Sequence, residues 1–119
     1  MGNPHAVIHV NEIKNLEIEK TAKDIQNSGY FPESVNVGFM QINSPSNISL
    51  RVFERGVGET QACGTGACAA VVFGVENDLL ENTVCVSLPG GDLNINYNNG
   101  SEVFMTGPAE FVFEGSVKV

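Results

Sequence analysis

The chain has 119 residues, a length that fits one domain with a single hydrophobic core. Fourteen acidic and six basic residues give a net charge of −8, which makes nucleic acid and anionic membranes unfavourable partners. No apolar run approaches the roughly 18 residues of a membrane span, and no basic and then apolar amino terminus directs export, so a cytoplasmic location is expected. Three unevenly spaced cysteines indicate reduced thiols rather than a disulfide framework.

The first half of the chain predicts three strands and one helix. β-branched and apolar residues at 5–10 predict a strand that begins just after Pro4. Residues 15–30 place apolar side chains near helical intervals and charged ones elsewhere, which predicts an amphipathic surface helix. Its apolar face would consist of Leu16, Ile18, Ala22 and Ile25. Strands at 36–42 and 48–55 flank a polar turn, which predicts a hairpin.

The second half begins with a helix over 64–77. The segment GACAAVVFGV is apolar on every side, so this helix should lie inside the sheet assembly rather than on its surface. Asn77 and Asp78 tolerate the left-handed conformation that follows many helices, so the helix should stop there. Four strand patterns follow, at 83–88, 93–97, 102–106 and 109–115. The predicted fold is α+β, with mostly antiparallel or mixed strands curled around a central apolar helix and one amphipathic helix on the surface.

Cys63 stands directly before the second helix. The first amides of a helix have no partner within it, so Gly64 and Thr65 offer free N–H donors beside the sulfur, where a carboxylate or phosphate could bind. The positive end of the helix favours the thiolate, so the pKa of Cys63 is expected to lie below that of a free cysteine. The structural alternative is a small residue in a tight turn, with Thr60 or Thr65 as the helix cap.

Other chemistries find less support in the sequence. The two histidines, His5 and His9, and the three cysteines are potential metal ligands, but their spacing fits no zinc pattern, so no metal is expected. Cys68 and Cys85 lie in apolar surroundings that are typical of buried, unreactive thiols. The segment GTGACA lacks the glycine pattern of phosphate and dinucleotide loops.

Five motifs occur in order along the chain: MGNPH at 1–5, VNVGFM at 35–40, ERGVGETQACGTGACAA at 54–70, then LPGG and MTGPA. Together they resemble the carboxy-terminal half of diaminopimelate epimerase. The similarity covers nearly all of the chain, and the segment at 54–70 is its most specific part.

The resemblance implies a cofactor-independent epimerase that interconverts LL- and meso-diaminopimelate, on the way to lysine and the bacterial cell wall. In such enzymes one thiolate removes the α-proton and a second thiol returns a proton from the opposite face, so neither metal nor pyridoxal is required. Cys63 matches one thiol of this pair. The amides of Gly64 and Thr65 would then hold the α-carboxylate and stabilise the charge that develops in it.

Further site residues carry over from the resemblance one by one. Glu54 matches the acid that binds the substrate ammonium, and Arg55 matches the residue that clamps the distal carboxylate. Asn3 and Asn36 match polar neighbours at the distal end, and His5 matches a histidine that is important for activity. The two charged residues could instead form a solvated pair at a strand end, with Asn3 as a turn residue and His5 as a structural imidazole.

The second thiol of the family lies in an amino-terminal half that has no counterpart in these 119 residues. Residues 1–119 are therefore expected to form a single domain that lacks turnover alone and needs an amino-terminal half as its partner. The surface that this half would cover would be bare, which also predicts self-association. Two other functions stay open: a module that binds small amino-acid carboxylates without catalysis, and a thiol hydrolase with His5 as its base.

Overall fold

The computed structural model describes residues 4–31, 34–98, 100, 102–106 and 114–117. Within these ranges the chain forms one eight-stranded sheet and two helices. The strands are β1 (His5–His9), β2 (Asn36–Ser44), β3 (Asn47–Glu54), β4 (Gly58–Thr60), β5 (Thr83–Leu88), β6 (Gly91–Tyr97), β7 (Val103–Thr106) and β8 (Glu114–Val117). The helices are α1 (Ile18–Gln26) and α2 (Gly64–Glu76).

The sheet is mixed, as predicted. Its strands run in the order β1-β2-β3-β5-β6-β7-β8, and the short β4 pairs with β3. The pairs β1/β2 and β3/β5 are parallel, whereas the other pairs are antiparallel. A parallel pair needs a crossover connection, and for β3 and β5 the crossover contains α2. The topology therefore places the start of α2 near the end of β3.

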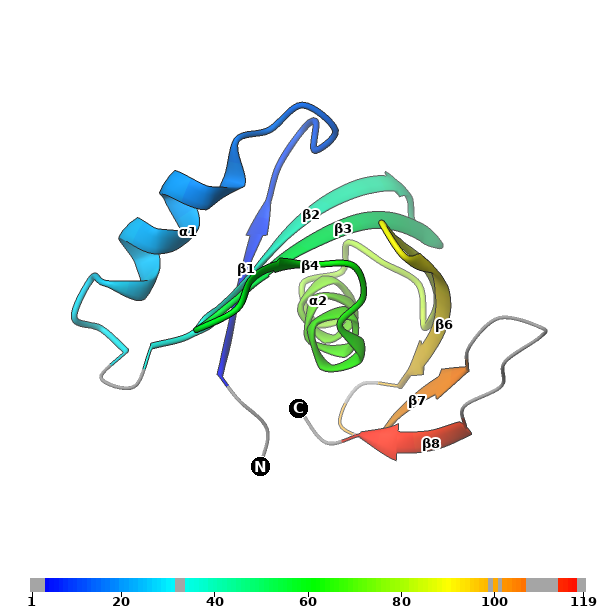
Figure 1. Ribbon diagram of the computed structural model, residues 1–119. Helices are drawn as coiled ribbons and strands as arrows, with labels where there is room; N and C mark the ends of the chain where they lie inside the picture. Colours follow the sequence, from blue (N-terminus) through cyan, green and yellow to red (C-terminus); the bar gives the residue numbers. More distant parts are fainter. Residues whose placement is uncertain (1–3, 32–33, 99, 101, 107–113, 118–119) are drawn as a thin grey trace.

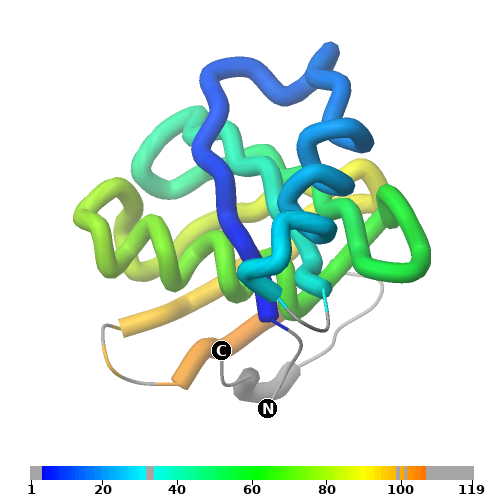
Figure 2. Tube along the Cα trace, turned by 90° about the vertical axis from the view of Figure 1, so that its left-hand side faces the viewer, coloured from blue at the N-terminus to red at the C-terminus, as the bar shows by residue number. Residues whose placement is uncertain are grey.

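Helix α2 packs against the concave face of the curled sheet (Figure 1). Four of its residues are fully buried, namely Ala67, Cys68, Ala70 and Val71. They share a core with side chains of the surrounding strands, among them Met40, Leu50, Val86 and Ile95. Figure 2 shows α2 from the side, with β7 beneath it. At its end, Asn77 is the C-cap and Asp78 has a φ of +61°, which confirms the predicted stop.

Helix α1 covers the opposite face of the sheet (Figure 1). Ile18 and Ala22 are buried against a second core that includes Val37 and Phe39. Successive residues of a strand point to opposite faces, so β2 directs Phe39 to this core and Met40 to the core around α2. The predicted amphipathic helix is thus confirmed.

Several boundaries differ from those predicted. Helix α1 starts three residues late, because Leu16 N–H donates to the Ile13 carbonyl (3.2 Å) in a turn that precedes it. The sequence does not predict β4, because a strand of only three residues, Gly58–Thr60, is too short to show an alternation of apolar and polar side chains. Of the strand predicted at 109–115, residues 109–113 lie outside the described residues, and β8 covers the remainder.

Candidate active site

Cys63 is itself the N-cap of helix α2. Its backbone is extended, with φ −143° and ψ 102°, and its sulfur accepts a hydrogen bond from the Gly66 amide at 3.4 Å. The Thr65 hydroxyl lies 3.6 Å from the same sulfur. The cap is therefore the cysteine and neither of the two threonines that the sequence offered for it.

Glycine at the start of α2 permits close approach to the sulfur. A Cβ atom on Gly66 would lie 3.1 Å from Val52 Cγ2 and 3.2 Å from Cys63 Sγ, so a larger residue would push the thiol away from its amide donor. A Cβ atom on Gly64 would lie 3.0 Å from Cε of Met105, which comes from β7. The first turn of α2 thus lies between the thiol on one side and a thioether on the other.

The pKa of Cys63 is raised in this chain, so the expected lowering is wrong. Burial has the largest effect, because a thiolate loses hydration in the core. Hydrogen bonds from Thr65 and from the Gly66 amide act in the opposite direction but do not outweigh it. The carboxylate of Glu54 adds to the rise through its charge and a hydrogen-bond contact with the thiol. At neutral pH the sulfur of this chain is a thiol.

Glu54 is the last residue of β3 and brings a carboxylate to the start of α2. Its Oε2 accepts a hydrogen bond from the Thr60 hydroxyl at 2.8 Å. Strand β4 makes this contact possible: Thr60 pairs with Val52, two residues before Glu54, and is a diagonal neighbour of the acid on the sheet. The charge of Glu54 acts on both Cys63 and His5.

His5 opens β1 and lies opposite Asn36 in the parallel β1/β2 pair. Both of its ring nitrogens are buried, and neither has a hydrogen-bond partner among the described residues. Burial lowers the pKa of His5, and the nearby charge of Glu54 opposes this shift only in part. The imidazole is therefore held as a neutral ring beside an acid.

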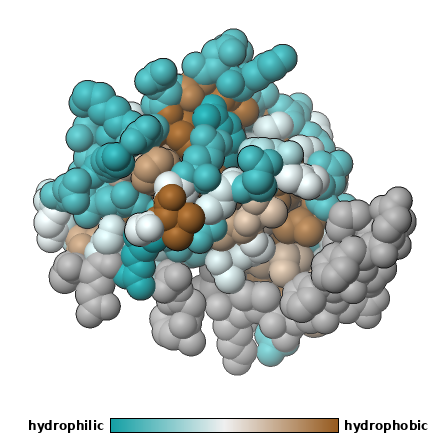
Figure 3. Space-filling model, in the orientation of Figure 1, coloured by the Kyte–Doolittle hydropathy of each residue, from teal (hydrophilic) through white to brown (hydrophobic). Residues whose placement is uncertain are grey.

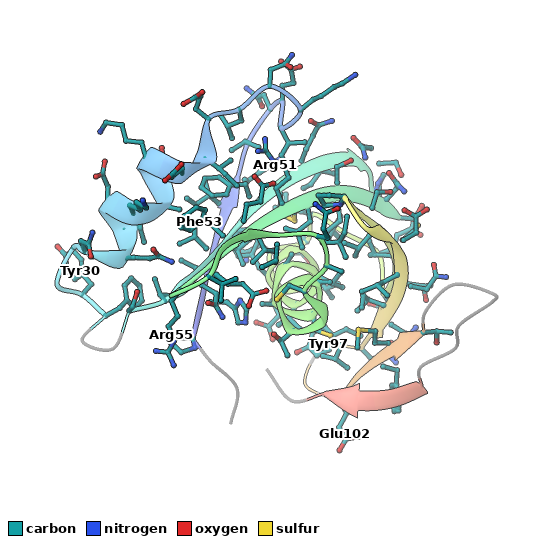
Figure 4. The ribbon with its side chains drawn as sticks, viewed as in Figure 1. Tyr30, Arg51, Phe53, Arg55, Tyr97 and Glu102 are labelled. Atoms are coloured by element: carbon teal, nitrogen blue, oxygen red, sulfur yellow. The ribbon has the colours of Figure 1, made fainter. Side chains whose placement is uncertain are left out.

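Asn36, the first residue of β2, is a buried polar residue with only 3% of its surface exposed. Its Oδ1 accepts the backbone N–H of Arg55 at 2.8 Å, which ties the start of β2 to the end of β3. The Arg55 side chain is half-buried, and Figure 4 shows it at the end of the sheet where β3 finishes, directed away from the core. Asn3 lies outside the described residues.

The structure thus brings His5, Asn36, Glu54 and Cys63 to one edge of the sheet, where β1 and β2 begin and β3 ends. The other two thiols lie within α2 and on β5, outside this group of four residues. Cys68 is fully buried, and burial together with the charge of Cys63 raises its pKa to about 11, while Cys85 is half-buried on β5. Among the described residues, no three His, Cys, Asp or Glu side chains converge as metal ligands would.

The matches to known proteins identify the family of the chain. The diaminopimelate epimerase family model matches residues 1–112. The chain belongs to the diaminopimelate epimerase family. Its relatives include the diaminopimelate epimerases of Neisseria meningitidis, 60% identical over 119 residues, and of Alkalilimnicola ehrlichii, 53% identical over 120 residues. These alignments cover 98% and 100% of the chain but only 42% and 43% of the relatives, so the chain spans less than half of a family member's length.

Solved structures with the same fold include phenazine biosynthesis proteins of the PhzF family. The Bacillus anthracis protein matches with a TM-score of 0.65 over 90% of this chain and 35% of its own, at 22% identity. The Clostridium difficile protein matches with a TM-score of 0.62 at 23% identity. At this level of identity the likeness between these proteins and the present chain is one of fold. No helix in the described part of the chain is long and apolar enough to cross a membrane.

Proposed function

We propose that this chain is the carboxy-terminal domain of a diaminopimelate epimerase and supplies one of its two catalytic thiols, Cys63. The observation that carries the proposal is the start of α2, where the Cys63 sulfur has two hydrogen-bond partners and the charge of an acid, Glu54, acts on it. The same acid acts on the neutral imidazole of His5. A base and its electrostatic partners have to converge in this way if a weakly acidic α-proton is to be removed. In the proposed fold of the active enzyme, α2 is the central helix of one of two similar halves.

In the proposed reaction, Cys63 exchanges a proton with the α-carbon of diaminopimelate from one face. The substrate ammonium binds Glu54, which cancels the charge that opposes ionisation of the thiol and keeps the amine protonated. The amides of Gly64 and Thr65 hold the α-carboxylate, into which charge spreads as the proton leaves. His5 contributes a neutral imidazole beside Glu54.

At the distal end of the substrate, we propose that Arg55 binds the second carboxylate, with Asn3 and Asn36 as its polar neighbours. The second thiol comes from an amino-terminal half, in keeping with relatives more than twice as long as the chain. No cofactor or metal takes part in this scheme, since two thiols carry the proton. The chain alone would have one base and no turnover.

The direct test is the α-proton signal of LL-diaminopimelate in D₂O, followed by ¹H NMR. With the chain alone we expect no inversion, and with the amino-terminal half of the Neisseria meningitidis relative added we expect the signal to disappear. Cys63→Ser should abolish this loss, because a hydroxyl is far too weak an acid to replace the thiol. Serine is also a good N-cap, so this variant removes the base without removing the cap of α2.

Cys85→Ser is the matched control, since Cys85 is a half-buried thiol on β5 outside the site. It should leave exchange unchanged. Exchange that persists in Cys63→Ser, or full turnover by the chain alone, would refute the proposal.

A second candidate is a module that binds amino-acid carboxylates without catalysis. The observation in its favour is the raised pKa of Cys63, which leaves a neutral thiol at the helix start. Binding of diaminopimelate to the chain, detected by NMR shifts at Gly64 and Thr65, with no exchange after the other half is added, would favour this module. A thiol hydrolase has less support, because His5 makes no hydrogen bond to Cys63 in the described structure.

A further inference from the structure

We propose that Thr60 is a positioning residue, which holds the carboxylate of Glu54 beside the Cys63 thiol, and that the Arg51–Glu59 ion pair fixes the strand that carries it. The proposal rests on the role of Glu54 proposed above. Glu54 is half-buried at a strand end, followed by a turn with two glycines of positive φ, Gly56 (+76°) and Gly58 (+106°). A glutamate in such a place has several rotamers open to it unless another group selects one.

The Thr60 hydroxyl makes that selection. It donates to Oε2 of Glu54 at 2.8 Å, within the usual range of a hydroxyl hydrogen bond to a carboxylate. Threonine is β-branched and has few χ1 rotamers, so the direction of its hydroxyl follows from the backbone of β4. One oxygen of Glu54 is thereby occupied, and the carboxylate stays close enough for its charge to act on the thiol of Cys63.

Strand β4 is only three residues long, so its position needs support from elsewhere. Glu59 provides this support: its two carboxylate oxygens accept hydrogen bonds from Nε and Nη2 of Arg51 at 2.7 and 2.9 Å. Nη1 of Arg51 also donates to the carbonyls of Ile13 and Leu16, at 2.8 and 2.9 Å. A planar guanidinium with four such bonds has little conformational freedom, so it fixes the position of Glu59. Thr60 follows Glu59 in the chain, so its backbone position is fixed as well.

Figure 4 places Arg51 on the side of the sheet that faces the segment before α1. Glu59 and Thr60 are consecutive in a strand, so their side chains point to opposite faces. The ion pair therefore anchors β4 from the α1 side, while Thr60 acts on the α2 side, where Cys63 lies. The anchor and the active site lie on opposite faces of the same strand.

The test measures the pH dependence of Cys63 alkylation by iodoacetamide in the 119-residue chain, with mass spectrometry that resolves the three thiols. The variants are Thr60→Val, which keeps the shape but loses the hydroxyl, Thr60→Ser, which keeps the donor, Glu54→Gln, and the double variant Thr60→Val/Glu54→Gln. Charged and polar groups that face Cys63 are Glu54, Thr65 and Cys68, and these stay constant apart from Glu54. Thr21→Val, on the exposed side of α1, is the matched control.

If Thr60 holds Glu54 near the thiol, its loss lets the half-exposed carboxylate move towards water. The alkylation midpoint of Cys63 should then fall by roughly half a unit to one unit in Thr60→Val, as in Glu54→Gln, because a negative charge has left the thiol. Thr60→Ser and Thr21→Val should match the parent. The double variant should show no fall beyond that of Glu54→Gln, because Thr60 acts only through Glu54.

An unchanged midpoint in Thr60→Val, or a shift that persists in full on the Glu54→Gln background, would overturn the proposal. Rapid alkylation of buried Cys68 would reveal a variant that fails to fold, and Thr60→Ala then removes the same hydroxyl and decides in its place. The alkylation profile needs no substrate. A failure of the proposed function would instead appear as absent Cys63-dependent exchange with diaminopimelate, while the link from Thr60 to Cys63 would still be measured.

Discussion

At Cys63 two local effects act on one sulfur in opposite directions. The helix start and the Gly66 amide stabilise the thiolate, whereas burial and the charge of Glu54 stabilise the thiol. Only the first effect can be predicted from the sequence, because the glycines and the apolar run indicate the start of a helix. Burial of the thiol depends on strands that are distant in sequence, so the sign of the shift could not be predicted from residues 59–72 alone.

His5 leads to a pH dependence of stability at the same scale. Burial lowers the pKa of His5 below its ordinary value of 6.5, so the folded chain binds a proton at this ring less readily than the unfolded chain does. The contribution of a neutral His5 to the free energy of unfolding is therefore complete above pH 6.5 and is lost as the pH falls through the lowered value. The parent should therefore lose stability as the pH falls below 6.5.

Urea unfolding at a series of pH values measures this loss. His5→Asn should reduce it, since an amide does not titrate, and His9→Asn should not, since His9 is exposed on the same strand. Equal pH dependence in the parent and in His5→Asn would contradict the assignment.

At the scale of elements, the sequence predicted both helices and seven strand segments, and it missed β4. Longer strands reveal themselves through their own pattern: β6 alternates between exposed and buried residues, and β2 begins with a run of buried residues. Strand β4 exists because β3 offers it an edge, and this information lies in the pairing of Val52 with Thr60 rather than in the three residues themselves. For the same reason the contact between Thr60 and Glu54 was not predicted, although both residues lie in the motif at 54–70.

Arg51 connects three elements, so its loss should have an effect beyond one ion pair. Arg51→Met would leave Glu59 without its partner and would remove one donor from each of the half-buried carbonyls of Ile13 and Leu16, which should lower the free energy of unfolding by about 2–3 kcal/mol. Lys20→Met is the matched control, because the Lys20–Asp24 pair is 84% and 68% exposed and should contribute less than about 0.5 kcal/mol. Urea denaturation of the three proteins gives both values, and equal effects would show that Arg51 is only a surface charge.

At the scale of the whole molecule, the chain covers only 42% and 43% of the two diaminopimelate epimerases named above. A face that meets the rest of the protein in those relatives would be bare in the chain alone. Figure 3 shows hydrophobic residues at the surface in several patches between hydrophilic ones. Among the exposed large apolar residues of the described chain, Val57 is nearest in sequence to Glu54 and Cys63; it is 72% exposed, at the turn after Arg55.

We therefore expect the isolated chain to self-associate at high concentration, as measured by light scattering. The amino-terminal half of the Neisseria meningitidis relative should compete with this association, because both would cover the same face. Val57→Ser should weaken self-association, whereas Leu79→Ser, beyond the opposite end of α2, should not. A monomer at every concentration would contradict the expectation.

The two ends of the β2/β3 strand pair differ in how well they can accommodate an inserted residue. The candidate site lies at the end where β1 and β2 begin and β3 finishes. The turn through exposed Pro45 and Ser46 lies at the opposite end, where β2 finishes and β3 begins. An inserted residue at that turn would lengthen a surface loop, for which the entropic cost grows only slowly. The same insertion between Glu54 and Cys63 would shift β4 and separate the acid from the thiol. Length variation among related chains should therefore be common at the first position and rare at the second.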